Sequence, residues 1–234
     1  MMFFHLLIRV VWLGCWGEGG RIGRSFRCLP ATYGQSPIVG DDGLGAAFFQ
    51  RYPYLHGSDG YLVPGFEDEN RHFSWLARTR LEYTAAGDSM SRIGGQLLVD
   101  TALRWGTDVS MAYHEEELME GRDDAWLNDM NVVFRFAQSS KLQMRTGLGA
   151  NWMIDRVGSE WGFNFTYSAD WFPHDPFIVS SELDWGTLGK ASLFHLRSTL
   201  GVHYHRFEVY GGVDYLAVED SRLGGLVTGM RVWY

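Results

Sequence analysis

From residue 72 to the end of the chain, apolar and polar residues alternate with a period of two, which is typical of β-strands with two different faces. The clearest run is apolar at the odd positions from Trp161 to Trp171 and polar or small at the even positions from Gly162 to Asp170. The same alternation recurs ten times. The ten apolar sets lie within 73–83, 93–105, 109–113, 130–136, 142–154, 161–171, 177–185, 194–204, 207–217 and 226–234. We therefore predict ten strands between residues 72 and 234.

Charge is confined to the other face of these strands. The ten apolar sets hold 55 positions and no charged residue, although 21% of the chain is charged. The alternate positions carry seven arginines and seven acidic residues: Arg78, Arg80, Glu82, Asp100, Arg104, Arg135, Arg145, Asp170, Glu182, Asp184, Arg197, Glu208, Asp214 and Arg231. In a soluble barrel or sandwich, the uncharged face would be the core. In a membrane barrel, the uncharged face would meet lipid and the charges would pair in the lumen.

Three features favour the membrane arrangement. Most runs are 9 to 13 residues long, about the length that a tilted strand needs to cross a bilayer. Aromatic residues such as Trp105, Trp185 and Tyr204 lie near the ends of their apolar sets, where an interfacial girdle would place them. The predicted connections alternate between tight turns, such as 106–108, and longer loops, of which 114–128 is the longest.

The N-terminal third of the chain lacks this alternation. Residues 1–34 open with an apolar run interrupted by Arg9 and end in Thr32-Tyr33-Gly34, a small-residue cleavage site, so we interpret them as an export signal. Residues 35–71 are rich in Gly, Pro and Asp, and we expect a periplasmic tail or plug segment with a short helix at 44–50. An extra pair of strands is the alternative. Both cysteines precede residue 29, so a disulfide or a Cys-based zinc site in the strands is not expected.

The composition narrows the function classes. With 20 Lys and Arg against 28 Asp and Glu, the formal net charge is −8. A nucleic-acid-binding protein needs a basic face to displace counterions, so we expect no nucleic-acid partner. Nothing in the sequence indicates a cofactor.

The last strand carries a family resemblance. Residues Leu226 to Tyr234 alternate back from a terminal aromatic residue, with Met230, Val232 and Tyr234 on the uncharged face. This ending resembles the C-terminal assembly signal of bacterial outer-membrane β-barrel proteins, and no specific subfamily matches. The resemblance implies an antiparallel up-and-down transmembrane barrel in the bacterial outer membrane, in contact with its lipid. It also implies insertion by the barrel assembly machinery and both termini in the periplasm.

A barrel of about ten strands leaves little free space, because eight strands already give an interior that side chains fill. Bulky arginines would fill much of this lumen, so we predict at most a narrow pore. The expected function is structural or surface-interacting, without enzymatic activity. One alternative is a secreted soluble β-barrel whose apolar interior binds a lipophilic ligand. Another is a barrel hydrolase.

The hydrolase alternative depends on the hairpin near residue 188. If its turn centres on Thr187 and Leu188, Ser180 faces His195 and Glu182 lies beside them. These three side chains resemble parts of a nucleophile, base and carboxylate set. Ser, His and Glu are equally ordinary polar residues of a lumen, so no catalytic site is predicted.

Two further groups have metal-binding chemistry. His203 and His205 share one strand face, a pattern that can bind a metal, but no third ligand accompanies them and we predict no metal site. The stretch 114–129 is the most acidic of the chain, and its carboxylates suit divalent cations that could bridge to lipopolysaccharide. The alternative there is a solvated acidic loop.

Overall fold

The computed structural model describes residues 47–55, 60–64, 73–86, 90–118 and 121–234, which all belong to one compact unit. The regular elements in these ranges are strands: β1 (Ala47–Phe49), β2 (Leu62–Pro64), β3 (Trp75–Ala86), β4 (Met90–Thr101), β5 (Trp105–Leu118), β6 (Gly121–Gln138), β7 (Leu142–Ile154), β8 (Ser159–His174), β9 (Phe177–Leu188), β10 (Ala191–Tyr204), β11 (Phe207–Val218) and β12 (Ser221–Trp233). No helix in the described ranges is long and apolar enough to span a bilayer. The export signal predicted at 1–34 lies outside the described residues.

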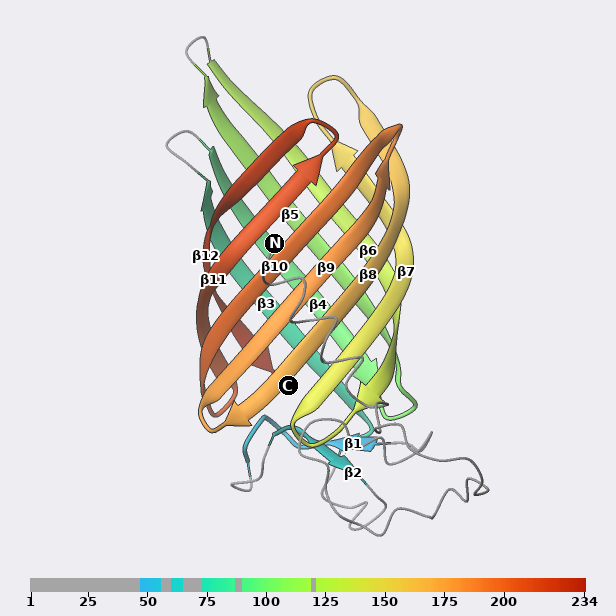
Figure 1. Ribbon diagram of the computed structural model, residues 1–234, viewed down its shortest axis with the longest axis vertical. Coiled ribbons are helices and arrows are strands. Elements are labelled where there is room, and N and C mark those ends of the chain that lie inside the picture. Colours follow the sequence, from blue (N-terminus) through green and yellow to red (C-terminus); the bar gives the residue numbers. More distant parts are fainter. Residues whose placement is uncertain (1–46, 56–59, 65–72, 87–89, 119–120) are drawn as a thin grey trace, which may run out of the picture. The chain divides into compact units, whose positions relative to one another are not determined.

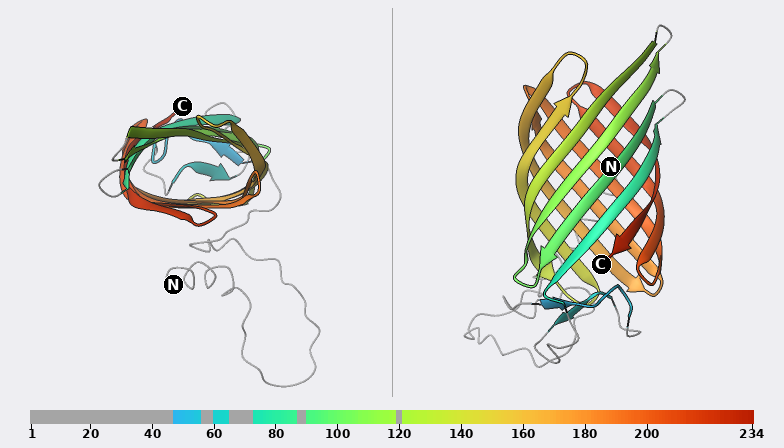
Figure 2. Two further views of the ribbon diagram at one scale, coloured as in Figure 1. Left: turned by 90° about the horizontal axis from the view of Figure 1, so that it is seen from above. Right: turned by 180° about the vertical axis from the view of Figure 1, so that it is seen from behind.

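Strands β3 to β12 form a closed barrel in which every neighbouring pair is antiparallel (Figures 1 and 2). Consecutive strands are neighbours throughout. The ring closes where Leu226–Trp233 of β12 pairs with Ala85–Arg78 of β3. The predicted ten-stranded antiparallel barrel is therefore confirmed.

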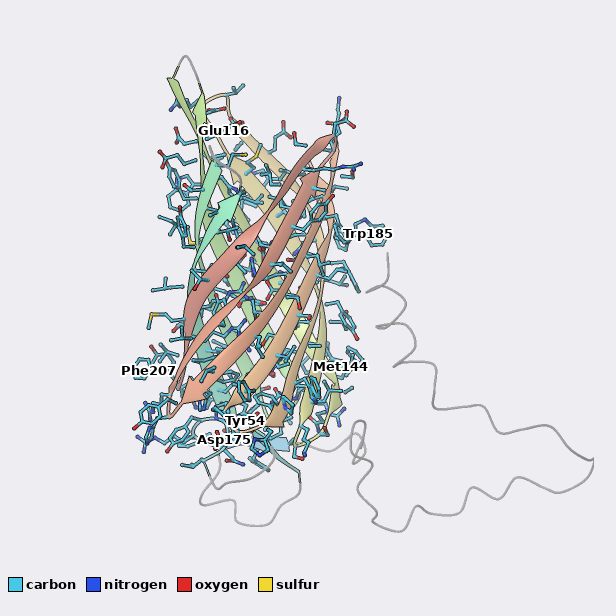
Figure 3. All side chains as sticks on the ribbon, turned by 60° about the vertical axis from the view of Figure 1, so that its left-hand side comes forward. Tyr54, Glu116, Met144, Asp175, Trp185 and Phe207 are labelled. Atoms are coloured by element: carbon cyan, nitrogen blue, oxygen red, sulfur yellow. The ribbon has the colours of Figure 1, made fainter. Side chains whose placement is uncertain are left out.

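The two faces of the wall are placed as in a membrane barrel. None of the 55 uncharged positions is buried, and they point away from the lumen. Of the 14 charged residues on the other face, 13 are buried inside and Glu182 is half-buried. Figure 3 shows Trp185 and Phe207 projecting outward near opposite ends of the barrel. The soluble alternative, a barrel whose apolar interior binds a lipophilic ligand, is therefore contradicted.

Two predicted connections are wrong. Gly106 to Asp108 belong to β5, and the turn before that strand lies at Ala102 to Arg104. The stretch 114–128 is not a loop either, because β5 runs to Leu118 and pairs with β6 up to Leu118↔Gly121. This hairpin carries charge on both faces beyond the apolar band. Its alternation is therefore lost while its backbone ladder continues.

The connections are consequently short at both ends of the barrel, which contradicts the expected difference in loop length. The β9–β10 and β11–β12 connections have two residues each, 189–190 and 219–220, as do the opposite turns 175–176 and 205–206. The two ends of the barrel differ instead in how far the strands extend beyond the wall. Strand β6, with 18 residues, and β8, with 16, carry their hairpins farthest.

Strands β1 and β2 form a separate hairpin at one end of the barrel (Figure 1). We name this end the lower mouth; it carries the β4–β5, β6–β7, β8–β9 and β10–β11 turns, and the opposite end is the upper mouth. The helix expected at 44–50 is contradicted for 47–49, because β1 pairs with β2 on one side and Phe49 bridges to Phe73 on the other. Residues 44–46 lie outside the described ranges.

Candidate functional site

The outer surface carries two belts of aromatic side chains. In the belt near the lower mouth, Trp105 and Phe134 are 5.0 Å apart between ring centroids. In the belt near the upper mouth, Trp152 and Trp161 stack at 5.4 Å. On β10, Phe194 and Tyr204 mark the two belts ten residues apart. Ten residues span about 33 Å along the strand. Because strands are inclined by about 40° to the barrel axis, the two belts lie roughly 25 Å apart along that axis.

The surface between the belts is aliphatic. Leu97, Leu148 and Val213 are 44%, 56% and 56% exposed. Ser181 and Ser198, two of the hydroxyl groups on this surface, are hydrogen-bonded to each other at 3.1 Å. An uncharged band of this height, bounded by aromatic girdles, fits the hydrocarbon layer of a bilayer.

Inside the barrel, a chain of ion pairs fills the lower half of the lumen. The guanidinium of Arg145 bridges Asp100 at 2.9 Å and Asp170 at 2.7 Å. Asp100 also binds Arg135 at 2.6 Å, and Asp170 also binds Arg78 at 2.9 Å. Each carboxylate therefore lies between two arginines that come from different strands.

A second network fills the centre. Arg197 contacts Glu182 at 2.8 Å, Glu82 at 2.9 Å and Asp214 at 3.2 Å. Arg80 holds both oxygens of Glu182, at 3.1 and 3.2 Å. This paired geometry gives strong charge-assisted hydrogen bonds.

Towards the upper mouth, His195 lies between two carboxylates. Its Nε2 is 2.8 Å from Asp214 and its Nδ1 is 3.3 Å from Asp184. Because a carboxylate only accepts hydrogen bonds, both ring nitrogens must carry hydrogen to satisfy both contacts. In this geometry His195 adds a positive charge to the lumen.

The described lumen is almost balanced in charge. It holds eight arginines against nine acidic side chains, and a protonated His195 makes the sum zero. The sequence analysis missed Arg92, Asp108 and Asp129. Asp108 was assigned to a turn and Asp129 to a loop, and Arg92 lies just before its predicted set. Extending the alternation past each apolar run would have found all three.

Apolar side chains close the upper part of the lumen. Leu188, Leu193 and Leu216 are buried together, with Leu127 and Leu223 packed against them. One remaining cavity in the lumen measures about 10 Å³ and another, lined by Thr84 and His114, about 20 Å³. A single water needs about 10–15 Å³, so each of these cavities is too small for a solute.

The lower mouth is filled by an aromatic cluster that includes the β1–β2 hairpin. Phe49 and Tyr61 of the hairpin are fully buried with Phe172 of β8, and Trp233 of β12 is 1% exposed. Burial raises the pKa of the Tyr61 phenol well above its usual range. Buried side chains thus fill the lumen near both ends.

The three hydrolase candidates do not form a catalytic set. Ser180 pairs with Thr199 across the ladder, whereas His195 pairs with Asp184, because the β9–β10 turn lies at 189–190 and not at 187–188. Ser180 donates to Asp170 at 2.7 Å, and Glu182 is held by arginines. The structure therefore places the candidate nucleophile and base four residues apart in register.

The two metal candidates diverge as well. His203 is buried in the lower mouth, whereas His205 lies exposed in the β10–β11 turn with a positive φ of 55°. The ring centroids of His203 and His205 lie 6.2 and 5.7 Å from the ring centroid of Tyr52. In the described parts of the chain, no three His, Cys, Asp or Glu side chains converge as metal ligands.

The C-terminal residues follow the same two faces. Met230, Val232 and Tyr234 point outward, whereas Arg231 and Trp233 are buried inside. The predicted assembly signal thus lies on the surface that faces away from the lumen.

No known protein family and no curated protein sequence matches the chain. Two solved structures of the Yersinia pestis protein Ail are similar to it. The outer membrane protein Ail in a phospholipid bilayer nanodisc is 11% identical with a TM-score of 0.39, covering 69% of this chain and 99% of Ail. The crystal structure of Ail, the attachment invasion locus protein, is 13% identical with a TM-score of 0.29, covering 69% and 97%.

Proposed function

We propose that this chain is a bacterial outer-membrane β-barrel protein with a closed lumen and a structural or surface-interaction role. Its exterior meets lipid, and its upper hairpins are presented to the outside. The C-terminal strand supports insertion by the barrel assembly machinery. A general porin is disfavoured, because both mouths are packed and the interior is filled with paired charges.

The polarity of the wall carries this proposal. The outward surface is apolar and runs around all ten strands. Typical residues on it are Leu81, Trp185 and Val209, each more than 60% exposed. Soluble monomers rarely expose a contiguous apolar patch beyond about 600 Å². In a bilayer the same surface is favourable, and the charges that would be costly there are inside.

Fractionation followed by electrophoresis tests the proposal. We expect the native protein in the outer-membrane fraction, and we expect an unboiled sample in detergent to migrate differently from a boiled one. A closed hydrogen-bonded barrel resists detergent at room temperature and unfolds on boiling. Recovery in the soluble fraction without detergent would contradict the membrane location.

We also propose that the acidic end of the β5–β6 hairpin attracts divalent cations. Glu115 pairs across the ladder with Asp124, and Glu116 pairs with Asp123 (Figure 3 labels Glu116 near the upper mouth). Asp124 also forms an ion pair with the exposed Arg156 at 2.6 Å. Calorimetric titration with Ca²⁺ should give a binding signal that disappears when the four carboxylates are replaced by amides. A native protein without any Ca²⁺ signal would remove this proposal.

A further inference from the structure

The seam between β12 and β3 differs from every other strand pair of the barrel. The other neighbouring strands are consecutive in the chain and are joined by short connections. Strands β12 and β3 come from opposite ends of the barrel sequence, so their pairing closes a loop that contains the whole barrel. Closing so long a loop carries the largest entropic cost of all the pairings. An element that contacts both strands would strengthen the seam.

The β1–β2 hairpin contacts both sides of this seam. Phe49 of β1 exchanges two backbone hydrogen bonds of 3.0 Å with Phe73, two residues before β3 begins. The ring of Tyr61, directly before β2, packs edge-on against Trp233 at 5.0 Å between centroids. Trp233 is the last residue of β12. Phe49 and Tyr61 are themselves in contact at 5.6 Å, so the hairpin links the two strands through one aromatic unit.

The hairpin is also fixed to other strands around the mouth. Its backbone donates hydrogen bonds from Ala47 to Ala102 and from Tyr61 to Ser140, each 3.3 Å long. The Tyr54 hydroxyl donates to the carbonyl of Phe177 at 2.6 Å. Gly60 has a φ of 146°, and a Cβ there would lie 1.7 Å from the Ser140 carbonyl oxygen. Such close approach requires glycine, and it shows that the hairpin docks on a defined surface.

The Phe49 ring of the hairpin and the Trp233 ring of β12 also cover the lowest ion pairs of the lumen. The guanidinium of Arg135 lies 4.8 Å from the centroid of the Phe49 ring, and that of Arg78 lies 5.1 Å from the Trp233 ring. These are cation–π distances. The hairpin therefore excludes water from the network at the point where the seam ends.

We propose that the β1–β2 hairpin is a clamp that docks on the closed barrel and holds the β12–β3 seam together at the lower mouth. The hydrogen-bonded ring of the barrel is complete without the hairpin, because β3 to β12 form one closed sheet and β1 and β2 form a separate one. The clamp sets how readily the seam opens. Its role is distinct from the surface role proposed above.

Three variants of the full chain test the clamp after refolding into detergent. Phe49→Ala combined with Tyr61→Ala removes both rings. Tyr61→Phe keeps the ring and removes a buried hydroxyl that has no hydrogen-bond partner among the described residues. Leu193→Ala is the control, since it opens a cavity in the leucine cluster at the other mouth. Backbone hydrogen exchange is then followed strand by strand.

In the double variant, we expect exchange in 78–80 and 231–233 to accelerate about tenfold or more, while the ends of β6 and β7 at the upper mouth change little. Tyr61→Phe should match the native protein. Leu193→Ala should accelerate exchange near the upper mouth and leave the lower seam protected. Three outcomes would each overturn the proposal. Exchange could accelerate uniformly over the barrel, or it could stay unchanged at the seam. The double variant could also fail to form a heat-modifiable barrel.

Discussion

At the residue scale, each buried charge of the lumen depends on partners that are distant in the sequence. Arg78 binds Asp170, 92 residues away, and Arg80 binds Glu182, 102 residues away. The alternation predicts which residues face inward, because the side-chain direction repeats every two residues. It does not predict which partners meet, because they are set by the register and by the tilt of strands on opposite walls. One misplaced turn was enough to pair Ser180 with the wrong residue.

Arg145 is the residue on which most of the lower network depends, and its replacement by Met should be strongly destabilising. The change leaves Asp100 and Asp170 buried with one fewer cation each. Breaking a buried pair in this way costs about 3–5 kcal/mol of unfolding free energy. Arg156→Met is the control, because the Arg156–Asp124 pair is exposed and screened by solvent, so its loss should barely change the stability. Urea unfolding of both variants in lipid vesicles measures the difference, and equal losses would show that the network is not held as described.

At the element scale, the sequence predicts a strand best where the strand lies within the apolar and aromatic band. Strand β7 is predicted over its full length, Leu142–Ile154, because it lies within the apolar and aromatic band. Strands β5 and β6 are predicted too short, because their ends extend past the band into water. The β1–β2 hairpin was only an alternative, since three-residue strands carry too few positions to reveal a period.

The outer face of β7 gives a prediction for the lipid band. Leu148 lies midway along the strand and is 56% exposed. Leu148→Arg should cost about 2–4 kcal/mol in a bilayer, because it places a charge near the hydrocarbon midplane. Val157→Arg, in the β7–β8 loop where the side chain is 96% exposed, should change stability by less than about 0.5 kcal/mol. Refolding yield into vesicles and urea unfolding measure both, and a harmless Leu148→Arg would place this face in water.

At the scale of the whole molecule, the barrel is a wall with three filled layers inside. The aromatic cluster closes the lower mouth, paired charges occupy the centre, and leucines close the upper mouth. The sequence predicted the barrel and a largely filled lumen. It could not predict the two apolar closures, because they combine residues from strand ends with a hairpin that lacks periodicity.

A closed lumen predicts the absence of a stable pore. The native protein in a planar bilayer should show no steady conductance steps, because buried side chains fill the lumen at both mouths and the cavities of about 10 and 20 Å³ are too small for a hydrated ion. Single-channel recording at several voltages tests this expectation. Removing both rings of the clamp should leave the conductance low, since the ion pairs above it remain. A steady ohmic current through the native protein would contradict the closed lumen.

The central claim is that the uncharged face of the wall meets lipid, and a spin-label scan of β11 tests it most directly. Labels at Val209, Gly211, Val213 and Tyr215 occupy outward positions of one strand, and a label at Asp220 in the β11–β12 turn serves as the aqueous control. In vesicles, we predict that the four strand labels collide with oxygen and are hidden from a water-soluble nickel reagent, whereas Asp220 shows the reverse. Nickel access at all four strand positions would contradict the account.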